Sequence, residues 1–469
     1  MKKISILYLI LFVAFMFSAC VTKKYMRPEL ANTPEKYRNA KTDTVSFATI
    51  NWRDFFADPY LIALIDTALK NNFDLKRAES QIRTAEEYLK RSKALFAPSV
   101  GVNLGMGITG YNADGTLKPA PVLSLQANTT LQTPSVAAAW EVDIWGKLSA
   151  AKRSAKAQLE QSHAYRQAVQ TQLVAAIASA YYALVSFDEE LQVYEASAQT
   201  RKESMEVLKA FKEAAKTNEI SVNQGAAQYY YTLATIPQIK ISIQTLENQI
   251  AILVGKPYFE IKRSSIFDDR LEEVDYLQTG IPAQLLANRP DLVAAEQGLI
   301  AAHESWNYAR AAMYPSLVIS GNVGFDATNF ANWFAFPQSF VGSLIAGITA
   351  PIFAQRQLKT QRNVAAENKL QAIYYYENTM LNAQREVSDA LITYLLSKES
   401  IENQKLQVNE LTHAISGSME LLKSGKASYL DLLYAQDNVL TSAIGLVKYY
   451  LQNTNAKIEL YRSLGGGWK

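Results

Sequence analysis

The sequence has very little of the chemistry from which enzyme and metal sites are built. It contains one cysteine, Cys20, and three histidines among 469 residues. A single cysteine can form neither an internal disulfide nor a cysteine metal site. His163, His303 and His413 lie far apart in helical patterns, where packing or surface roles are expected. A phosphate-binding loop, a nucleophile elbow and metal-ligand spacings are also missing, so we expect no enzyme, no metal and no cofactor.

An excess of charge of either sign is missing as well. The chain has 47 basic and 44 acidic residues, a net charge of +3. It has no run of five or more basic residues, so a nucleic-acid partner is not expected. Apolar content is ordinary, which excludes a protein made of many transmembrane helices. Tyrosine, by contrast, is abundant at 26 residues, and this residue suits surfaces that meet both water and apolar material.

The N-terminus carries a long apolar run. Two lysines precede an apolar stretch at residues 4–17, and the letters FSAC occupy residues 17–20. The run is shorter than the roughly 20 residues that a membrane span needs, so residues 1–19 are predicted to be a signal peptide. The FSAC segment resembles a bacterial lipobox, in which Cys20 becomes the acylated first residue. The alternative is an ordinary secretory signal with a chance cysteine. Val21, the residue after the cysteine, favours location in the outer membrane.

Two segments of the chain align with each other without a gap. One begins at Asp74 and the other at Asp291, and Pro98 of the first falls on Pro315 of the second. Each segment is a helical pattern that stops at the proline and continues as an alternating strand. An internal repeat of this kind is a signal of architecture. We expect both aspartates to be helix N-caps and Pro290 to lie in a first helical turn.

At each of these prolines the apolar period changes from 3.6 to 2. Strands are expected at about 98–109 and 315–326, with partner strands at about 137–146 and 343–353. In each strand one alternating set of residues is apolar and the other is small or polar. A strand that faces lipid on one side and water on the other has this pattern, and so does a strand of a soluble sheet. Residues 110–136 are expected to form a loop, and residues 327–342 an aromatic loop that suits a membrane interface.

Each pair of strands is followed by a very long helical pattern. Residues 148–216 contain no proline and no glycine, and residues 357–423 are equally helical. At 1.5 Å per residue each helix would be roughly 100 Å long. A turn and a returning helix follow each pattern. We expect the first turn at Asn218, in a left-handed conformation, and the second at Gly425.

The number of strands restricts the architecture. Four strands cannot close a transmembrane barrel, because about eight are the minimum. An open sheet edge in lipid leaves unpaired backbone groups, each of which costs several kcal/mol. Strands in a membrane would therefore have to be shared among chains, and three chains would supply twelve. The long helical hairpins would then form a coiled wall beneath the barrel.

The order of motifs after Cys20 resembles the TolC-like outer-membrane factors of tripartite efflux systems, in their lipoprotein branch. The matching stretches are FADPYLIALIDTALKNNFDL, WEVDIWGKL, RPDLVAAE with PSLVISGNVG, APIF, REVSDAL, KSGKASYLDLLYAQ and LYRSLGGGW. The resemblance implies a mainly α fold with a transmembrane β-barrel, in which a homotrimer shares twelve strands above a periplasmic helical tunnel. It also implies a lipid-anchored channel of the outer membrane, without catalytic activity, that carries small molecules such as drugs outward. Its expected partners are a periplasmic adaptor and an inner-membrane pump of the resistance-nodulation-division class.

The same resemblance divides the chain into six segments. They are the signal peptide (1–19), the acylated cysteine with a tether (20–55), the first repeat (56–257), an equatorial linker (258–280), the second repeat (281–465) and a C-terminal tail (466–469). The only cofactor-like group expected is the covalent lipid on Cys20.

The resemblance places a constriction of the channel just after the second turn, at Leu430, Asp431 and Tyr434. In a trimer, Asp431 would become a ring of three carboxylates, which holds cations and repels anions. Helix phase alone does not say which face points inward, so a solvated position on the helix is the alternative. Some relatives carry arginine at the position of Asp437, and whether a salt-bridge lock exists here stays open.

A pore-less periplasmic coiled-coil lipoprotein is the alternative function. It would explain the long helices and Cys20. It would not explain two strand pairs with apolar and small faces, or the aromatic loop between two of the strands. The transported solute and the identity of the pump and adaptor cannot be read from these motifs.

Overall fold

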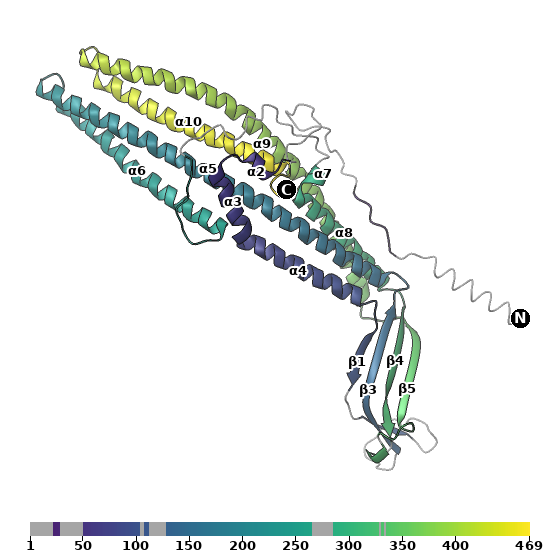
Figure 1. The fold of residues 1–469 in the computed structure, drawn as a ribbon. Coiled ribbons are helices and arrows are strands. Elements are labelled where there is room, and N and C mark those ends of the chain that lie inside the picture. Colours follow the sequence, from purple (N-terminus) through teal and green to yellow (C-terminus); the bar gives the residue numbers. More distant parts are fainter. Residues whose placement is uncertain are drawn as a thin grey trace. The chain divides into compact units, whose positions relative to one another are not determined.

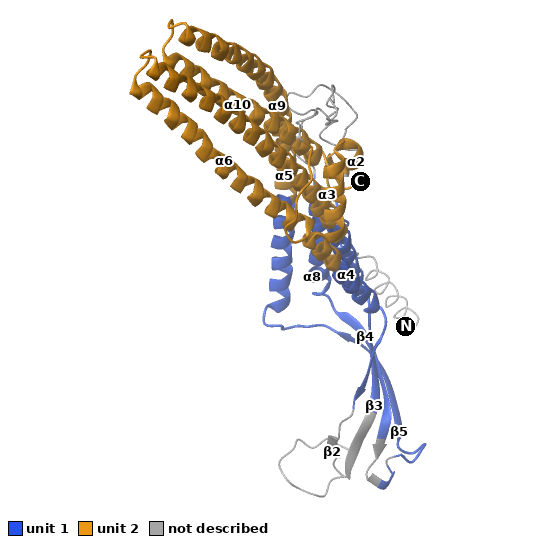
Figure 2. Ribbon diagram, turned by 60° about the vertical axis from the view of Figure 1, so that its left-hand side comes forward, with its two compact units in different colours: residues 1–29, 82–161, 295–375 blue, residues 30–81, 162–294, 376–469 orange. Residues whose placement is uncertain are grey.

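The computed structural model describes residues 22–28, 50–103, 107–111, 128–264, 285–327, 330–332 and 334–469. The chain divides into two compact units (Figure 2). Unit 1 comprises residues 1–29, 82–161 and 295–375, and unit 2 comprises residues 30–81, 162–294 and 376–469. Cys20, the predicted signal peptide and most of the predicted linker lie outside the described residues.

Helices make up most of the described chain (Figure 1). The first copy of the repeat contains α3 (Pro59–Asn71), α4 (Phe73–Ala94), α5 (Lys147–Glu213) and α6 (Glu219–Val254), and the short α2 (Trp52–Phe55) precedes it. The second copy contains α7 (Leu285–Asn288), α8 (Pro290–Ala311), α9 (Gln357–Lys423) and α10 (Tyr429–Ser463). The predicted succession of helix, strand pair and helical hairpin therefore occurs twice.

The strands of both copies form one antiparallel sheet in unit 1. Two short strands, β1 (Ser99–Asn103) and β2 (Gly107–Tyr111), pair with successive parts of β3 (Asn128–Val142). Together they take the place of one predicted strand. β3 also pairs with β4 (Ser316–Ala327), which pairs with β5 (Phe340–Thr349). The mainly helical fold with four antiparallel strand positions is confirmed.

The predicted boundaries of two strands were wrong. β3 begins at Asn128, so the end of the predicted loop at 110–136 is strand. Its register with β4 shifts between Gln132 and Ser135, and such an irregularity accommodates Pro134, which has no backbone N–H to donate. β5 begins three residues earlier than predicted and ends at Thr349, since Pro351 cannot continue the ladder.

The residues after β3 start a helix instead of extending the strand to 146. Asp143 accepts hydrogen bonds from the backbone N–H of Leu148 at 2.9 Å and of Ser149 at 2.8 Å. A carboxylate in this position satisfies N–H groups that have no partner within the helix. The turn after β3 therefore belongs to the start of α5.

The main core of unit 2 is a large cluster of buried apolar side chains from most of its helices. Large members are Trp52, Phe56, Leu61, Ile65, Ile177, Tyr181, Leu184, Val387, Leu460 and Tyr461. α5 includes an 18-residue stretch that is long and apolar enough to cross a membrane, of which 56% is buried. Because Ile177 and Leu184 are fully buried in the cluster, the apolar character of α5 is that of a core helix.

The two copies join their helices on the same plan. In the first copy, Asn72 donates from Nδ2 to the carbonyl of Leu253, near the end of α6, at 2.9 Å. In the second copy, Arg289 donates from Nη1 to the carbonyl of Ser463, at the end of α10, also at 2.9 Å. In each copy, this contact ties the start of the helix that leads to the strands to the end of the returning helix. We call these two contacts the repeat joints.

The predicted N-caps at Asp74 and Asp291 were wrong. Asn72 caps α4 by accepting from the N–H of Leu75 at 3.0 Å, and Asp74 lies in the first turn. Pro290 begins α8 as predicted, and Asp291 follows it and pairs with Arg289 at 2.6 Å.

Arg289 is buried between carboxylates and serves as a structural link. It contacts Glu386 at 2.9 Å as well as Asp291. Burial disfavours the charged form of Arg289 and by itself would lower its pKa. The two carboxylates have the larger effect, so the pKa of Arg289 is raised. Because these contacts hold helix ends together, the Arg-Pro-Asp stretch is part of the scaffold.

A glycine completes each repeat joint. Gly255 follows α6 with φ +71°, and Gly465 follows α10 with φ +98°. A Cβ at Gly255 would lie 2.6 Å from the carbonyl oxygen of Asn71, and a Cβ at Gly465 would lie 2.5 Å from that of Asn288. Both the left-handed backbone and the close approach therefore require glycine.

We predict that Gly465→Ala destabilises the protein much more than Gly425→Ala. Both glycines have positive φ, but a Cβ at Gly425 would meet nothing within 4 Å. The Gly425 variant should lose about 1 kcal/mol from backbone strain alone. The Gly465 variant adds a clash with the backbone and should lose roughly 2–4 kcal/mol. Thermal unfolding of the purified variants measures this, and equal losses would contradict the importance of the contact with Asn288.

Candidate channel aperture and membrane sheet

The register of the sheet brings the apolar side chains of its strands together on one face. Leu317 on β4 stands opposite Ile348 on β5, and Trp140 on β3 stands opposite Ile319 on β4. Residues directly opposite each other share a face, and successive residues alternate. The apolar face comprises Val100, Val102, Val136, Trp140, Val142, Leu317, Ile319, Val323, Phe325, Leu344 and Ile348.

The opposite face is mostly small or polar. It includes Ser99, Gly101, Asn103, Glu141, Ser320, Asn322, Gly324 and Ser343, with Val318, Val341 and Ile345 as its larger apolar members. The hydroxyl of Ser343 donates to the side-chain oxygen of Asn322. The alternation predicted from the sequence is therefore present in the paired strands.

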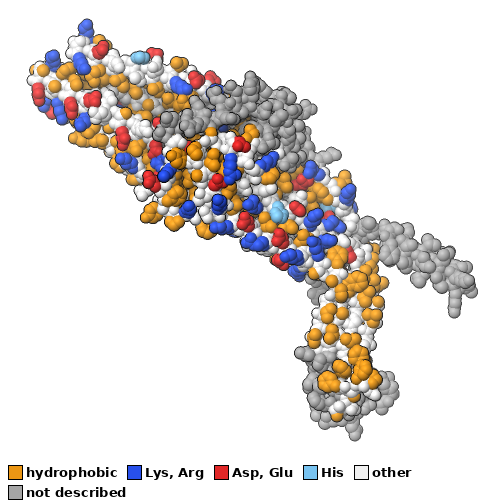
Figure 3. Space-filling model, in the orientation of Figure 1, with side chains coloured by type: hydrophobic (Ala, Val, Ile, Leu, Met, Phe, Trp, Pro, Cys, Tyr) orange, Lys and Arg blue, Asp and Glu red, His pale blue; other side chains and the backbone are white. Residues whose placement is uncertain are grey.

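Among the described residues of unit 1, no second layer covers the apolar face. Leu344 is 80% exposed, Ile348 74% and Val100 68%. Figure 3 shows that the strand region carries hydrophobic and uncharged side chains, whereas charged side chains lie over the helices. Exposed apolar patches of this kind mark contact with another molecule or with lipid. The alternation with a small, polar opposite face is the pattern of a membrane-barrel strand.

Aromatic side chains gather around the connection between β4 and β5. The ring of Phe325 lies 5.4 Å from that of Phe334 and 5.9 Å from that of Phe340, measured between centroids. Phe336 lies 5.9 Å from Phe340. Trp333, which belongs to the same predicted aromatic loop, lies outside the described residues. The described rings are all phenylalanine and form an aromatic cluster at this end of β4 and β5, where outer-membrane barrels carry girdles of aromatic residues.

Within the described sheet, the outer strands pair on one side only. β3 and β4 have neighbours on both sides, whereas β1 and β2 pair only with β3, and β5 pairs only with β4. The free side of an edge strand presents N–H and C=O groups that can pair with a further strand. The sheet is therefore open at both edges.

In unit 2, the two helical hairpins meet near their turns in a small apolar cluster. This tip cluster consists of Leu208 on α5, Val222 on α6, Leu422 on α9, and Tyr429 and Leu432 on α10. Burial raises the pKa of the Tyr429 hydroxyl. The cluster packs one hairpin of the chain against the other beside the turns.

The second turn has the predicted conformation, and the first does not. Gly425 is left-handed, and the next N–H, of Lys426, donates back to the carbonyl of Leu421 at 2.8 Å. In the first turn the left-handed residue is Ala215, with φ +55°. Asn218 is extended and caps α6, because its side chain accepts from the N–H of Ser221 at 3.0 Å. Asparagine suits both roles, and here the N-cap role prevails.

Leu430, Asp431 and Tyr434 lie on the side of α10 that points away from the tip cluster. Leu430 is 45% exposed and Tyr434 66%, whereas their neighbour Leu432 is buried. The Asp431 carboxylate accepts from the N–H and the hydroxyl of Ser428, each at 2.8 Å. These hydrogen bonds lower the pKa of Asp431. Asp431 therefore helps to cap α10 and presents a charge on the same exposed face as Leu430 and Tyr434.

A buried arginine that the sequence pattern did not single out lies on α5 near the tip cluster. The side chain of Arg201 is 2% exposed and forms an ion pair with Asp437 on α10. Its Nη1 also donates to the side-chain oxygen of Gln228 on α6, at 2.7 Å. The sequence signal was a charged residue in a helical seam of small and medium side chains, because a buried charge needs a partner.

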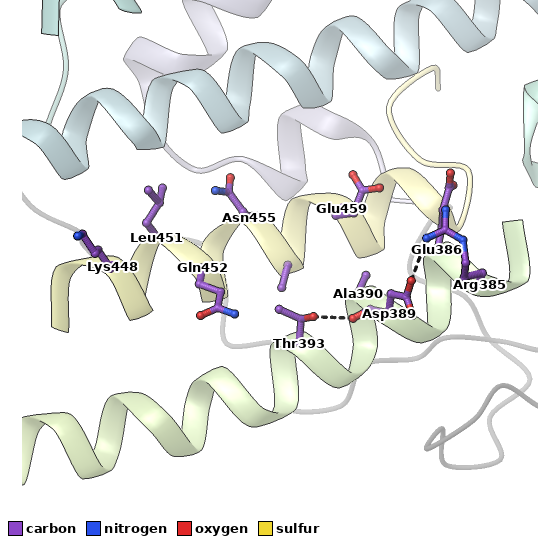
Figure 4. Close-up of a pocket in the computed structure, with 11 residues that line it drawn as sticks. Arg385, Glu386, Asp389, Ala390, Thr393, Lys448, Leu451, Gln452, Asn455 and Glu459 are labelled. Atoms are coloured by element: carbon purple, nitrogen blue, oxygen red, sulfur yellow. Dashed lines mark hydrogen bonds and ion pairs between the residues drawn. The ribbon is translucent and has the colours of Figure 1, made fainter. Parts of the chain in front are cut away.

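A groove of about 600 Å³ lies between α9 and α10 in unit 2 (Figure 4). Charges of both signs line it, namely those of Arg385, Glu386, Asp389, Lys448 and Glu459. Arg385 pairs with Asp389 at 3.0 Å. The balance of charge gives no preference for an ionic ligand. In the part of the chain that the structure describes, no group of three or more histidine, cysteine or acidic side chains could hold a metal ion.

Known outer-membrane proteins are similar to this chain over nearly its whole length. It is 26% identical over 460 residues to the probable outer membrane lipoprotein SilC of Salmonella typhimurium, covering 97% of each chain. It is 27% identical over 465 residues to the toluene efflux pump outer membrane protein TtgC of Pseudomonas putida, covering 97% of this chain and 94% of TtgC.

The fold is similar to that of a solved channel. The open state of the Neisseria gonorrhoeae MtrE outer membrane channel matches with a TM-score of 0.83 and 24% identity, over 96% of this chain and 99% of MtrE. The family model for outer membrane efflux proteins matches residues 64–256 and 281–466. With both copies of the repeat matched and the open, apolar sheet in place, the chain belongs to the outer membrane efflux protein family.

Proposed function

We propose that three copies of this chain assemble into the outer-membrane exit duct of a tripartite efflux system. The observation that carries the proposal is the sheet, which is apolar on one exposed face and, among the described residues, unpaired at both edges. Backbone groups at an edge cannot remain unpaired in lipid. Three four-stranded sheets, joined edge to edge, give a closed barrel of twelve strands, which lies within the size range of known outer-membrane barrels.

The small, polar face of the sheet then lines the water-filled interior, and the apolar face meets lipid. The helices of each hairpin continue the duct into the periplasm as a tunnel of packed helices. α5 and α9 have 67 residues each, which corresponds to roughly 100 Å of helix. A periplasmic adaptor and an inner-membrane pump of the resistance-nodulation-division class complete the system. A pore-less coiled-coil lipoprotein would leave the uncovered apolar sheet without a role.

The aperture of the duct lies at the turn of the second hairpin. Leu430, Asp431 and Tyr434 project from the exposed face of α10, which leaves them free to meet their equivalents in the other two copies. The hydrogen bonds from Ser428 lower the pKa of Asp431 and so favour its charged form. Three such carboxylates form a ring that attracts cations and repels anions.

We predict that Asp431→Ala raises the single-channel conductance several-fold in planar bilayers. The change removes both the charge and the cap of α10, so the constriction loses its ring of carboxylates and its fixed helix start. Asp431→Asn keeps a side-chain oxygen for the cap and should chiefly reduce cation selectivity.

Glu420→Gln is the matched control, because Glu420 is an exposed acid near the end of α9, outside the proposed aperture. It should conduct like the wild type. An Asp431→Ala channel that conducts like the wild type at low and at high salt would rule out this aperture.

The ion pair between Arg201 and Asp437 acts as a lock between the two hairpins of one chain. It joins α5 to α10 beside the tip cluster, and Gln436 reinforces it by donating to the hydroxyl of Ser204 at 2.8 Å. Opening of the aperture by separation of the hairpins must break these contacts. The arginine is buried, so loss of its carboxylate leaves a charge without compensation.

We predict that Asp437→Asn speeds hydrogen exchange in the adjacent parts of α5, α6 and α10 and increases the open time of the channel. The cost is about 1–3 kcal/mol, less than for a fully buried pair because Asp437 is 43% exposed. Glu195→Gln is the control, since Glu195 forms only an exposed pair with Lys240, at 3.9 Å. Similar exchange rates in both variants would contradict a lock.

The proposed acylation of Cys20 adds an anchor but does not account for membrane insertion by itself. We predict that a Cys20→Ser form, secreted through an ordinary signal peptide, still needs detergent for extraction, because the apolar face of the sheet remains. Mass spectrometry of the wild type should find the lipid on Cys20. Full solubility of the Cys20→Ser form would favour the pore-less scaffold.

A further inference from the structure

A group of cations surrounds a tryptophan on α8 in unit 1. The guanidinium carbon of Arg310 lies 4.6 Å from the ring centroid of Trp306, and the ammonium of Lys369 on α9 lies 4.7 Å from it. Arg310 and Lys369 are both half-buried. Cation–π contacts stabilise each cation but do not neutralise it.

The chain segment at residues 22–28 brings a third cation to this place. The backbone of Lys23 is fixed on α8 by three hydrogen bonds: its N–H donates to Asn307, and its carbonyl oxygen contacts the side chains of Asn307 and His303, all within 2.9 Å. Arg27 adds a two-bond ion pair with Glu296. Lys23 is thus held beside α8 by its main chain, and its side chain is exposed.

Among the described residues, this group lacks an anion of its own. The nearby carboxylate of Glu304 already pairs with Arg153, at 2.8 Å, and accepts from Asn307. The Nη1 atom of Arg310 is buried and has no hydrogen-bond partner in the described part of the chain. Burial is the largest cause that lowers the pKa of Lys369, and the positive charges of Lys23 and Arg310 lower it further. The site therefore brings positive charges together at a cost that a bound anion would offset.

We infer that Lys23, Arg310, Lys369 and Trp306 form a binding site for the phosphate headgroup of an anionic phospholipid. The inference rests on the proposed membrane position of the sheet. Arg310 lies in the last turn of α8, which ends at Ala311, and β4 begins at Ser316. The site thus lies beside the start of a lipid-facing strand. Arginine binds phosphate oxygens through two parallel hydrogen bonds, and tryptophan favours the headgroup level of a bilayer.

The test titrates the full-length protein in detergent with phosphatidylglycerol and with phosphatidylcholine and follows binding by native mass spectrometry. The wild type should prefer phosphatidylglycerol. Lys369→Gln and Arg310→Gln should each weaken its binding about fivefold, and the double variant about 25-fold. Lys359→Gln is the control, because it removes a charge from an exposed position on α9 without touching Trp306. Lys369→Arg should keep the preference.

Equal binding of the two lipids, or variants that bind like the wild type, would overturn the site. Displacement of phosphatidylglycerol by an equal concentration of inorganic phosphate would overturn the assignment to a lipid. The same spectra report whether each variant is trimeric, and conductance is measured on the same preparations. Normal conductance without a lipid preference overturns this site alone, whereas the absence of channels in every preparation overturns the proposed function.

Discussion

A backbone N–H or C=O group in lipid has no water to replace a missing partner, and the rest of the structure depends on how the chain meets this constraint. β3 and β4 satisfy it within the chain, because each has neighbours on both sides, but β1, β2 and β5 have a neighbour on one side only within the described sheet. Each unpaired group costs several kcal/mol, so a single chain cannot hold this sheet in a membrane. Each strand pair leads directly into a long hairpin along the chain, so closure by further copies also brings the hairpins of different copies together.

The repeat joints are the second requirement of such an assembly. A ring of strands can define the position of a helical tunnel only if the helices leave the ring in a fixed direction. Asn72 and Arg289 fill equivalent positions with different side chains, yet each donates to a carbonyl at the end of the returning helix. Gly255 and Gly465 allow the two backbones to approach closely enough for this contact. The two copies thus preserve the contact although its donor differs.

The local sequence pattern predicted much of this fold. It failed where contacts between residues distant in sequence determine the structure. The alternation in the strands predicted which residues share a face, because side-chain direction in a strand depends only on position. The sequence does not predict the start of β3, because proline and threonine in residues 128–136 favour a loop. Asn218 was placed in the wrong turn position, since asparagine suits two conformations.

The candidate site, too, could be predicted from the sequence only in part. The sequence does not predict that Arg201 is half of an ion pair, because Asp437 lies 236 residues away along the chain. Leu430, Asp431 and Tyr434 stay a predicted aperture. Their exposed face is compatible with that role, but which face lines a lumen depends on neighbouring copies. Cys20 lies outside the described residues, so its acylation rests on the lipobox alone.

The two hairpins differ most where they contact each other. Their equivalent positions follow from the N-caps Asn218 and Ser428, and from the glycines that end α6 and α10. By this alignment the equivalent of Arg201 is Leu411 and that of Asp437 is Ala227, so the ion pair has no counterpart in the other half of the chain. Tyr429 likewise corresponds to Glu219, and its hydroxyl lies 3.2 Å from where a Cβ on Gly225 would be.

In a trimer, this asymmetry makes the hairpin contacts within chains different from those between chains. A ring of six hairpins has three contacts within chains and three between chains. Arg201, Asp437 and Tyr429 strengthen only the contacts within chains, since each joins the two hairpins of a single copy. By the same alignment, the contacts between chains would have Leu411, Ala227 and Glu219 at these positions. Duplication alone would have produced six equal contacts, whereas the divergence of the two copies concentrates the charge pair and the buried tyrosine in the contacts within chains, which are the contacts that the proposed lock holds closed.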